Sequence, residues 1–111
     1  MAYTTDYASQ EPTRASVDAH RGPLVLEFGA PWCGHCQAAQ DGIAEALEAH
    51  PDVTHHKIED GRGRPLGRSF RVKLWPTLVF LRDGEELARL VRPRRAHEVA
   101  QALDAILREE R

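Results

Sequence analysis

The chain has 111 residues, of which 41% are hydrophobic and 29% are charged, and its formal net charge is -2. This length suits one domain that folds around its own core, and the composition is that of an ordinary globular protein. So small a net charge provides no attractive field for nucleic acid or an anionic membrane, and we expect neither as a partner.

The N-terminal residues are polar and show no periodicity, so residues 1–10 are predicted to be a flexible segment and residues 11–111 one domain. The start of the chain lacks the basic and apolar pattern of a signal peptide, and no segment approaches the ~20 apolar residues of a membrane span. We therefore expect a cytoplasmic protein. Thiols are kept reduced in that compartment, so a close pair of cysteines indicates catalysis or metal binding rather than a structural disulfide.

Hydrophobic periodicity predicts alternating helices and strands. They are, in chain order, a helix over 11–20, a strand over 24–30, a helix over 36–50, a strand over 53–59, a short helix over 65–70, a hairpin of strands 77–81 and 86–91, and a last helix that carries Ala96, Val99, Leu103, Ile106 and Leu107. The hairpin turn is Asp83-Gly84, a common signal for two-residue turns. Strands separated by helices pair in parallel through crossovers and the hairpin adds antiparallel pairing, so a mixed sheet with helices on both faces is expected.

Both cysteines of the chain lie in "PWCGHC", directly after the first predicted strand and at the start of the next helix. The unpaired amide groups and the dipole of a helix N-terminus stabilise a thiolate, which predicts Cys33 as a nucleophile. Cys36 lies one turn further along, less exposed but within reach of the Cys33 sulfur. It can therefore attack a mixed disulfide and release a substrate.

The segments "LVLEFGAPWCGHCQAAQ" and "KLWPTLVFLRDGEEL" together resemble the thioredoxin family, and the resemblance covers roughly Pro23 to the C-terminus. It implies the thioredoxin fold, an α/β architecture with a central mixed sheet of about four to five strands flanked by helices on both faces. It also implies a thiol-disulfide oxidoreductase in which Cys33 attacks, Cys36 resolves, and Pro76 is cis and faces the cysteines. Such a monomer would need no metal and no cofactor besides the redox-active Cys33–Cys36 disulfide. Its partners would be protein disulfide substrates and an electron-donating reductase or glutathione.

Glu27 is anomalous because it lies within an otherwise apolar strand. An ionised carboxylate buried there is costly unless it is paired, which favours the neutral acid and makes Glu27 a candidate proton carrier. In thioredoxins an aspartate occupies the matching position and is implied to accept the proton of the resolving thiol, with a lysine as counter-charge that matches Lys57. The alternative is that Glu27 lies at a solvated strand edge and Lys57 on a solvated face.

The resemblance also implies a substrate groove around the cysteines, which would be formed by Trp32, Gly34, His35, Trp75, Pro76 and Arg92. His35 stands where protein disulfide isomerases have histidine, and its protonated ring would favour the Cys33 thiolate and make the disulfide more oxidising. Trp32 would form an exposed apolar lip, and the main chain of Trp75 would pair with an extended substrate. The alternatives are that His35 is an exposed loop histidine without a function, that Trp32 belongs to the core, and that Pro76 is a turn proline before a strand.

Three positions depart from typical thioredoxins. Gly29 stands where a second tryptophan is common, Trp75 stands where a β-branched residue is usual, and Arg92-Pro93 replaces a glycine. These changes surround the expected groove, so the broad substrate range of thioredoxins is not carried over to this chain.

The other histidines are expected at the surface: His20, His50, His97, and His55 and His56 on opposite faces of their strand. A basic stretch formed by Arg62, Arg64, Arg68 and Arg71 indicates a solvated face or a patch for an acidic partner.

Two other classes of function stay open. A metal-binding module would use Cys33, Cys36, His35 and either His55 or His56, although the second ligand pair of a structural zinc site is missing. A non-catalytic adaptor with the same fold would bind protein partners through the surface around Trp75 and Arg92.

Overall fold

The structure is a computed structural model that describes residues 3–107. Its elements are, in chain order, α1 (Arg14–Ala19), β1 (Pro23–Gly29), α2 (Gly34–Glu48), β2 (Thr54–Glu59), α3 (Pro65–Ser69), β3 (Thr77–Arg82), β4 (Glu85–Val91) and α4 (Ala96–Leu107). Within these residues the strands form one mixed sheet in the order β2-β1-β3-β4. The predicted architecture is confirmed, with element ends that differ by a few residues. In this part of the chain no helix is long and apolar enough to cross a membrane.

The strand β1 lies inside the sheet, parallel to β2 and antiparallel to β3. Its residues from Leu24 to Gly29 are all buried, as an apolar strand covered on both faces requires. The hairpin of β3 and β4 turns at Asp83 and Gly84, whose φ angles of 51° and 82° are the left-handed values that an Asp-Gly turn needs. The end of β1 leads directly into the cysteine motif at the start of α2.

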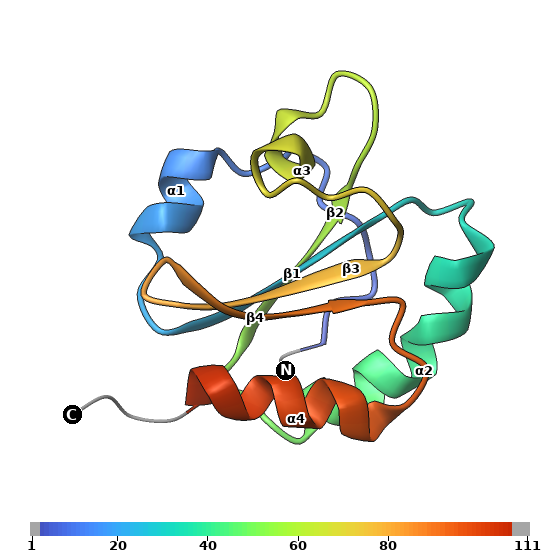
Figure 1. Cartoon of the computed structure of the whole chain (residues 1–111), viewed down its shortest axis with the longest axis vertical. Coiled ribbons are helices and arrows are strands. Elements are labelled where there is room, and N and C mark those ends of the chain that lie inside the picture. Colours follow the sequence, from blue (N-terminus) through green and yellow to red (C-terminus); the bar gives the residue numbers. More distant parts are fainter. Residues whose placement is uncertain (1–2, 108–111) are drawn as a thin grey trace.

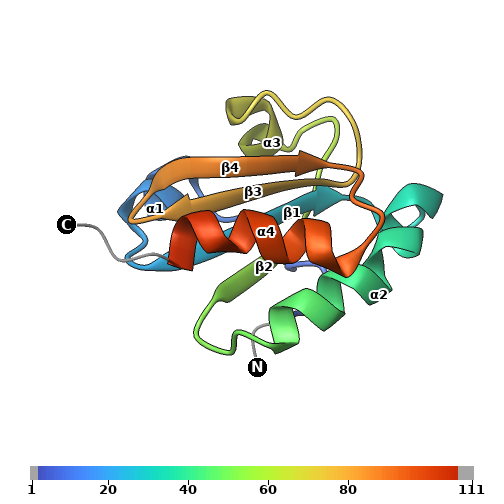
Figure 2. The same cartoon turned by 60° about the horizontal axis from the view of Figure 1, so that its bottom comes forward.

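Helices cover both faces of the sheet, α2 and α4 on one face and α1 and α3 on the other (Figures 1 and 2). One core cluster joins α2 and α4 to the sheet and includes Ile43, Leu103 and Phe80. Another joins α1 and α3 to the opposite face and includes Val17 and Leu66. Full burial of a large apolar side chain stabilises the folded state by about 1.5–3 kcal/mol. These clusters therefore fix the positions of the end of β1 and the start of α2.

Residues 3–8 run beside β2, whereas the sequence predicts a flexible segment over residues 1–10. The amide of Ala8 donates to the carbonyl of Lys57 at 2.8 Å, and Tyr7 forms a parallel bridge with Lys57. The ring of Tyr3 stacks on His55 with centroids 5.5 Å apart. The segment therefore places two tyrosine side chains next to the buried part of β2.

Candidate active site

The two cysteines are free thiols at the N-terminus of α2. Cys33 is the N-cap residue, and its sulfur accepts a hydrogen bond from the Cys36 amide at 3.2 Å. Cys33 is 7% exposed and Cys36 is 2% exposed. The helix terminus thus directs an unpaired amide donor at the Cys33 sulfur, as the sequence predicts, and Cys36 is the more shielded of the two thiols.

Cys36 is an unusually weak acid. Burial, with a smaller contribution from its hydrogen bond to Cys33, raises the pKa of the Cys36 thiol to about 12. Hydrogen bonds from the Ala30 main chain and from the Tyr7 hydroxyl act in the opposite direction and lower this pKa. At neutral pH Cys36 therefore holds its proton, and any attack by its sulfur requires that the proton leave.

Trp32, Trp75 and Cys33 surround an open hollow of about 350 Å³ next to the cysteine motif, which Gly34, His35 and Arg92 also line. Trp32 is 71% exposed, and its ring meets that of Trp75 edge to face with centroids 5.4 Å apart. The Trp75 indole is anchored because its Nε1 donates to Asp60 Oδ2 at 2.8 Å.

Trp75, which lines this hollow, is joined to Pro76 by a cis peptide bond. Arg92 lies beside it in a left-handed conformation with φ of 55°, at the position where the resemblance places a glycine. The Arg92 amide donates to the Pro76 carbonyl at 2.9 Å, and Arg92 Nε donates to the Trp75 carbonyl at 2.7 Å. Arg92 therefore already occupies one main-chain acceptor at the edge of the hollow.

Glu27 is fully buried on β1 and accepts two hydrogen bonds, which excludes the alternative of a solvated strand edge. Its Oε2 accepts from Gln40 Nε2 at 2.7 Å, and its Oε1 lies 2.9 Å from His55 Nε2. The Thr4 amide donates to His55 Nδ1 at 2.9 Å, so the ring proton must be on Nε2 and is donated to Glu27. Both carboxylate oxygens are therefore paired.

The prediction that His55 is a surface residue is wrong, because the residue is only 3% exposed. His55 and His56 do point to opposite faces of β2. On its own face, the ring of His55 lies between the Glu27 carboxylate and the stacked ring of Tyr3. His56 is half-buried. Two adjacent histidines have the same polarity, so the sequence contains no signal that distinguishes them.

Lys57 is buried as well, which excludes a solvated face. Its Nζ donates to Gln40 Oε1 at 3.1 Å and to the Thr5 carbonyl at 3.2 Å, and it lies 4.7 Å from the centre of the Tyr7 ring. Gln40 therefore joins the lysine to Glu27 by donating with its nitrogen and accepting with its oxygen.

Four residues of this arrangement were missed by the sequence reasoning, namely Tyr7, Gln40, His55 and Asp60. Gln40 could have been found, because it follows Cys36 by one helical turn and so lies on the same face of α2. Tyr7 belongs to a segment without periodicity, and its position depends on pairing with β2. Within residues 3–107 no group of three or more His, Cys, Asp or Glu side chains is placed to hold a metal ion.

Comparison with known proteins agrees with this geometry. A family model described as Thioredoxin matches residues 5–105 of the chain. Thioredoxin 2 from Pseudomonas aeruginosa PAO1, in its reduced form, has a structure that superposes with a TM-score of 0.82 at 53% identity, covering 94% of this chain and 96% of that one. The chain belongs to the thioredoxin family.

Other relatives of this thioredoxin-family protein include one of similar length and one that is much longer. It is 27% identical over 85 residues to thioredoxin Asp f 28 of Aspergillus fumigatus, covering 77% of this chain and 79% of the relative. It is 40% identical over 86 residues to protein disulfide-isomerase A2 of Pongo abelii, covering 72% of this chain but only 16% of that protein. The family and the paired cysteines together identify a thiol-disulfide oxidoreductase.

Proposed function

We propose that this thioredoxin-family protein exchanges disulfides with protein substrates through Cys33 as nucleophile and Cys36 as resolving residue. It acts in the cytoplasm as a monomer, is recharged by an electron-donating reductase or by glutathione, and so contributes to electron transport and redox homeostasis. The observation that carries the proposal is the Cys33 sulfur at the N-terminus of α2, which accepts the Cys36 amide at 3.2 Å. Such a donor stabilises the thiolate relative to the thiol.

Two exchange steps follow from this arrangement. The Cys33 thiolate attacks one sulfur of the substrate disulfide, which forms a mixed disulfide and expels the other substrate sulfur as a thiolate. The Cys36 sulfur then attacks the Cys33 sulfur and expels the second substrate thiolate. Two electrons pass to the substrate, and the protein is left with a Cys33–Cys36 disulfide.

The second step needs an acceptor for the Cys36 proton, and Glu27 is the proposed one. The Gln40 side-chain nitrogen donates both to Glu27 Oε2 at 2.7 Å and to the Cys36 carbonyl at 2.8 Å, so it holds the carboxylate close to the start of α2. Lys57, joined through the Gln40 oxygen, supplies a compensating positive charge for this buried acid.

The hollow beside Cys33 is the proposed site for an extended substrate segment, with Trp32 and Trp75 as its apolar walls and Gly34 and His35 along its edge. A substrate amide that approached the Trp75 carbonyl would compete with Arg92 Nε, which already donates to it. A substrate that displaces Arg92 Nε from this carbonyl must offer the guanidinium group another hydrogen-bond acceptor. Arg92 therefore restricts the substrates to those that carry such an acceptor.

Trapping with Cys36→Ser tests the proposal. This variant should stall at the mixed disulfide with protein substrates, and Cys33→Ser, the matched control, should trap none. The wild-type protein should also reduce insulin in the presence of dithiothreitol. Two results would overturn the proposal. One is that both variants trap the same substrates, and the other is that neither variant traps a substrate and the wild-type protein does not reduce insulin.

A non-catalytic adaptor is the second candidate, and the exposed Trp32, at 71%, is the observation that favours it. An adaptor would keep its partners when both cysteines are replaced by serine, whereas the proposed enzyme would lose them. Elemental analysis for zinc in the purified protein tests the metal-binding alternative, for which one equivalent per chain would be needed.

A further inference from the structure

The space above Gly29 is filled by two atoms from distant parts of the chain. A Cβ atom added at Gly29 would lie 2.5 Å from the Cys36 sulfur and 3.2 Å from the Tyr7 hydroxyl. A side chain at this position is therefore excluded, and the tyrosine approaches the resolving cysteine from the N-terminal segment through the space that the glycine leaves free.

Tyr7 is held in this position from both sides. Its main chain forms a parallel bridge with Lys57, and the amide of the next residue, Ala8, donates to the Lys57 carbonyl at 2.8 Å. On its other side, the Lys57 ammonium lies 4.7 Å from the centre of the Tyr7 ring. Tyr7 and Cys36 line one hollow of about 440 Å³ together with Gln40 and Lys57.

We propose that Tyr7 is a catalytic residue of the resolving step, in which its hydroxyl donates a hydrogen bond to the Cys36 sulfur as the thiolate forms. Both oxygens of Glu27 are paired with Gln40 and His55, whereas the Tyr7 hydroxyl shares the space above Gly29 with the reacting sulfur. Burial, followed by the negative charge that Cys36 can carry, raises the pKa of Tyr7, so the phenol remains a donor across the physiological range. The Cys36 proton passes to Glu27 as above, and Tyr7 keeps its own.

This inference rests on the proposed roles of the two cysteines and is tested with Tyr7→Phe. The matched control is Tyr3→Phe, because Tyr3 lies on the same segment but donates to Gln40 Oε1 at 2.6 Å instead of to a cysteine. In rapid-mixing experiments with a peptide disulfide, Tyr7→Phe should form the mixed disulfide at the wild-type rate and resolve it about tenfold more slowly, as loss of a hydrogen bond to a charged group predicts.

A second measurement does not require activity. In a Cys33→Ser background, the pH midpoint for alkylation of Cys36 by iodoacetamide should rise in Tyr7→Phe and stay unchanged in Tyr3→Phe. Equal effects of the two tyrosine changes on resolution, or an unchanged alkylation midpoint in Tyr7→Phe, would overturn the proposal. Absence of any mixed disulfide in the wild-type protein would instead contradict the proposed function.

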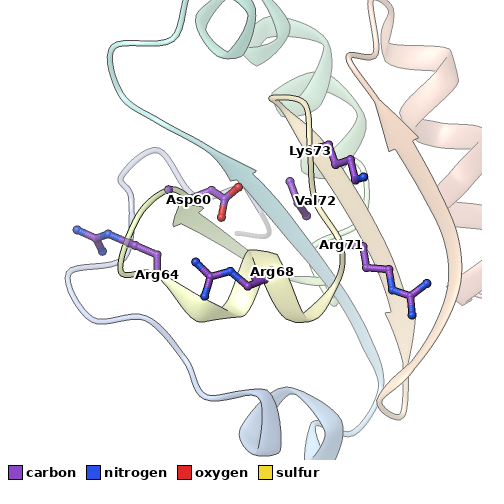
Figure 3. A pocket seen from close by; sticks show the side chains of 7 residues that line it. Asp60, Arg64, Arg68, Arg71, Val72 and Lys73 are labelled. Carbon is purple, nitrogen blue, oxygen red and sulfur yellow. The ribbon is translucent and has the colours of Figure 1, made fainter.

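A different surface carries a second inference. A hollow of about 440 Å³ next to α3 is lined by the cationic residues Arg64, Arg68, Arg71 and Lys73. Figure 3 shows their side chains. The acidic group that also lines it, Asp60, is engaged by the Trp75 indole at 2.8 Å. Because the whole chain has a net charge of -2, this concentration of positive charge is not a consequence of composition.

The basic hollow is a neighbour of the one beside Cys33, since Lys73 lines both. Arg68, Arg71 and Lys73 are exposed, and Arg71 adopts a left-handed conformation with φ of 60°. A substrate whose cysteine meets Cys33 would extend its neighbouring residues over these cations. We infer that the protein prefers protein substrates that carry carboxylates next to the reacting disulfide.

Two disulfide peptides that differ only in flanking glutamate or glutamine test this preference. At low salt the acidic peptide should have a kcat/KM about tenfold higher, and the ratio should fall towards one at high salt because exposed charges are screened. The double variant Arg68→Ala/Arg71→Ala should lose the preference while its rate with the glutamine peptide stays within about twofold of wild type.

Arg62→Ala/Arg95→Ala is the control, because it removes the same charge from residues that do not line the hollow. A preference that survives in Arg68→Ala/Arg71→Ala, or that disappears equally in the control, would overturn the inference. No reduction of the glutamine peptide by the wild-type protein would count against the proposed function instead.

Discussion

Replacing His55 with leucine should strongly destabilise the protein, because it removes one donor from a carboxylate with no exposed surface. The Glu27 and His55 side chains are both 0% exposed, and their contact is 2.9 Å long. Removing a hydrogen-bond donor from a buried carboxylate costs about 2–3 kcal/mol, because the charge of Glu27 stays buried with one partner fewer. Leucine keeps most of the apolar volume, so the cavity contribution is small.

The Thr4 amide also loses its acceptor on His55 Nδ1, but it is only half-buried and adds little to this cost. We therefore expect the free energy of unfolding to fall by about 2–3 kcal/mol in His55→Leu. His56→Leu is the matched control, because the neighbouring histidine is half-buried on the opposite face of β2, and it should cost less than about 1 kcal/mol.

Urea unfolding followed by far-UV circular dichroism measures both values, provided that the slope m is unchanged. The double variant Glu27→Leu/His55→Leu should lose less stability than the sum of the losses in Glu27→Leu and His55→Leu, since either single change already breaks the contact between the two side chains. If the two histidine variants differed by less than about 1 kcal/mol, or if the losses of the two single variants simply added, His55 would not be the group that stabilises Glu27.

Brief treatment of the reduced protein with iodoacetamide near neutral pH should modify Cys33 well before Cys36. Burial raises the pKa of Cys36 to about 12, so its alkylation should increase only as the pH approaches that value, and equal rates by mass mapping would contradict the assigned roles. Glu27→Gln should slow release of the mixed disulfide more than its formation, because it removes the proton acceptor; equal slowing of both steps in rapid-quench experiments would exclude that function. His35→Pro should lower the reduction potential measured by glutathione equilibration, by about 30 mV for each 1.4 kcal/mol of lost thiolate stabilisation. An unchanged or higher potential would remove His35 from the redox chemistry.

Local patterns in the sequence determined the architecture and the centre of the chemistry. An unbroken apolar run can be satisfied only by a strand with both faces covered, and this places β1 inside the sheet. Two cysteines one turn apart at a helix start need no distant partner to form a redox pair, and Asp83-Gly84 specifies its turn by conformational preference alone. These features depend on residues near one another in the chain, so periodicity and spacing are enough to predict them.

Only the tertiary structure decided which polar groups are buried beside the cysteines. Both His55 and His56 are polar, so no hydrophobic pattern shows that His55 is the one in contact with Glu27. The position of Tyr7 against Cys36 depends on pairing of the N-terminal segment with β2 and on the space above Gly29. Such contacts join residues far apart in the chain. Their free energy comes from satisfying buried donors and acceptors, which requires that β1, β2 and α2 already be packed together.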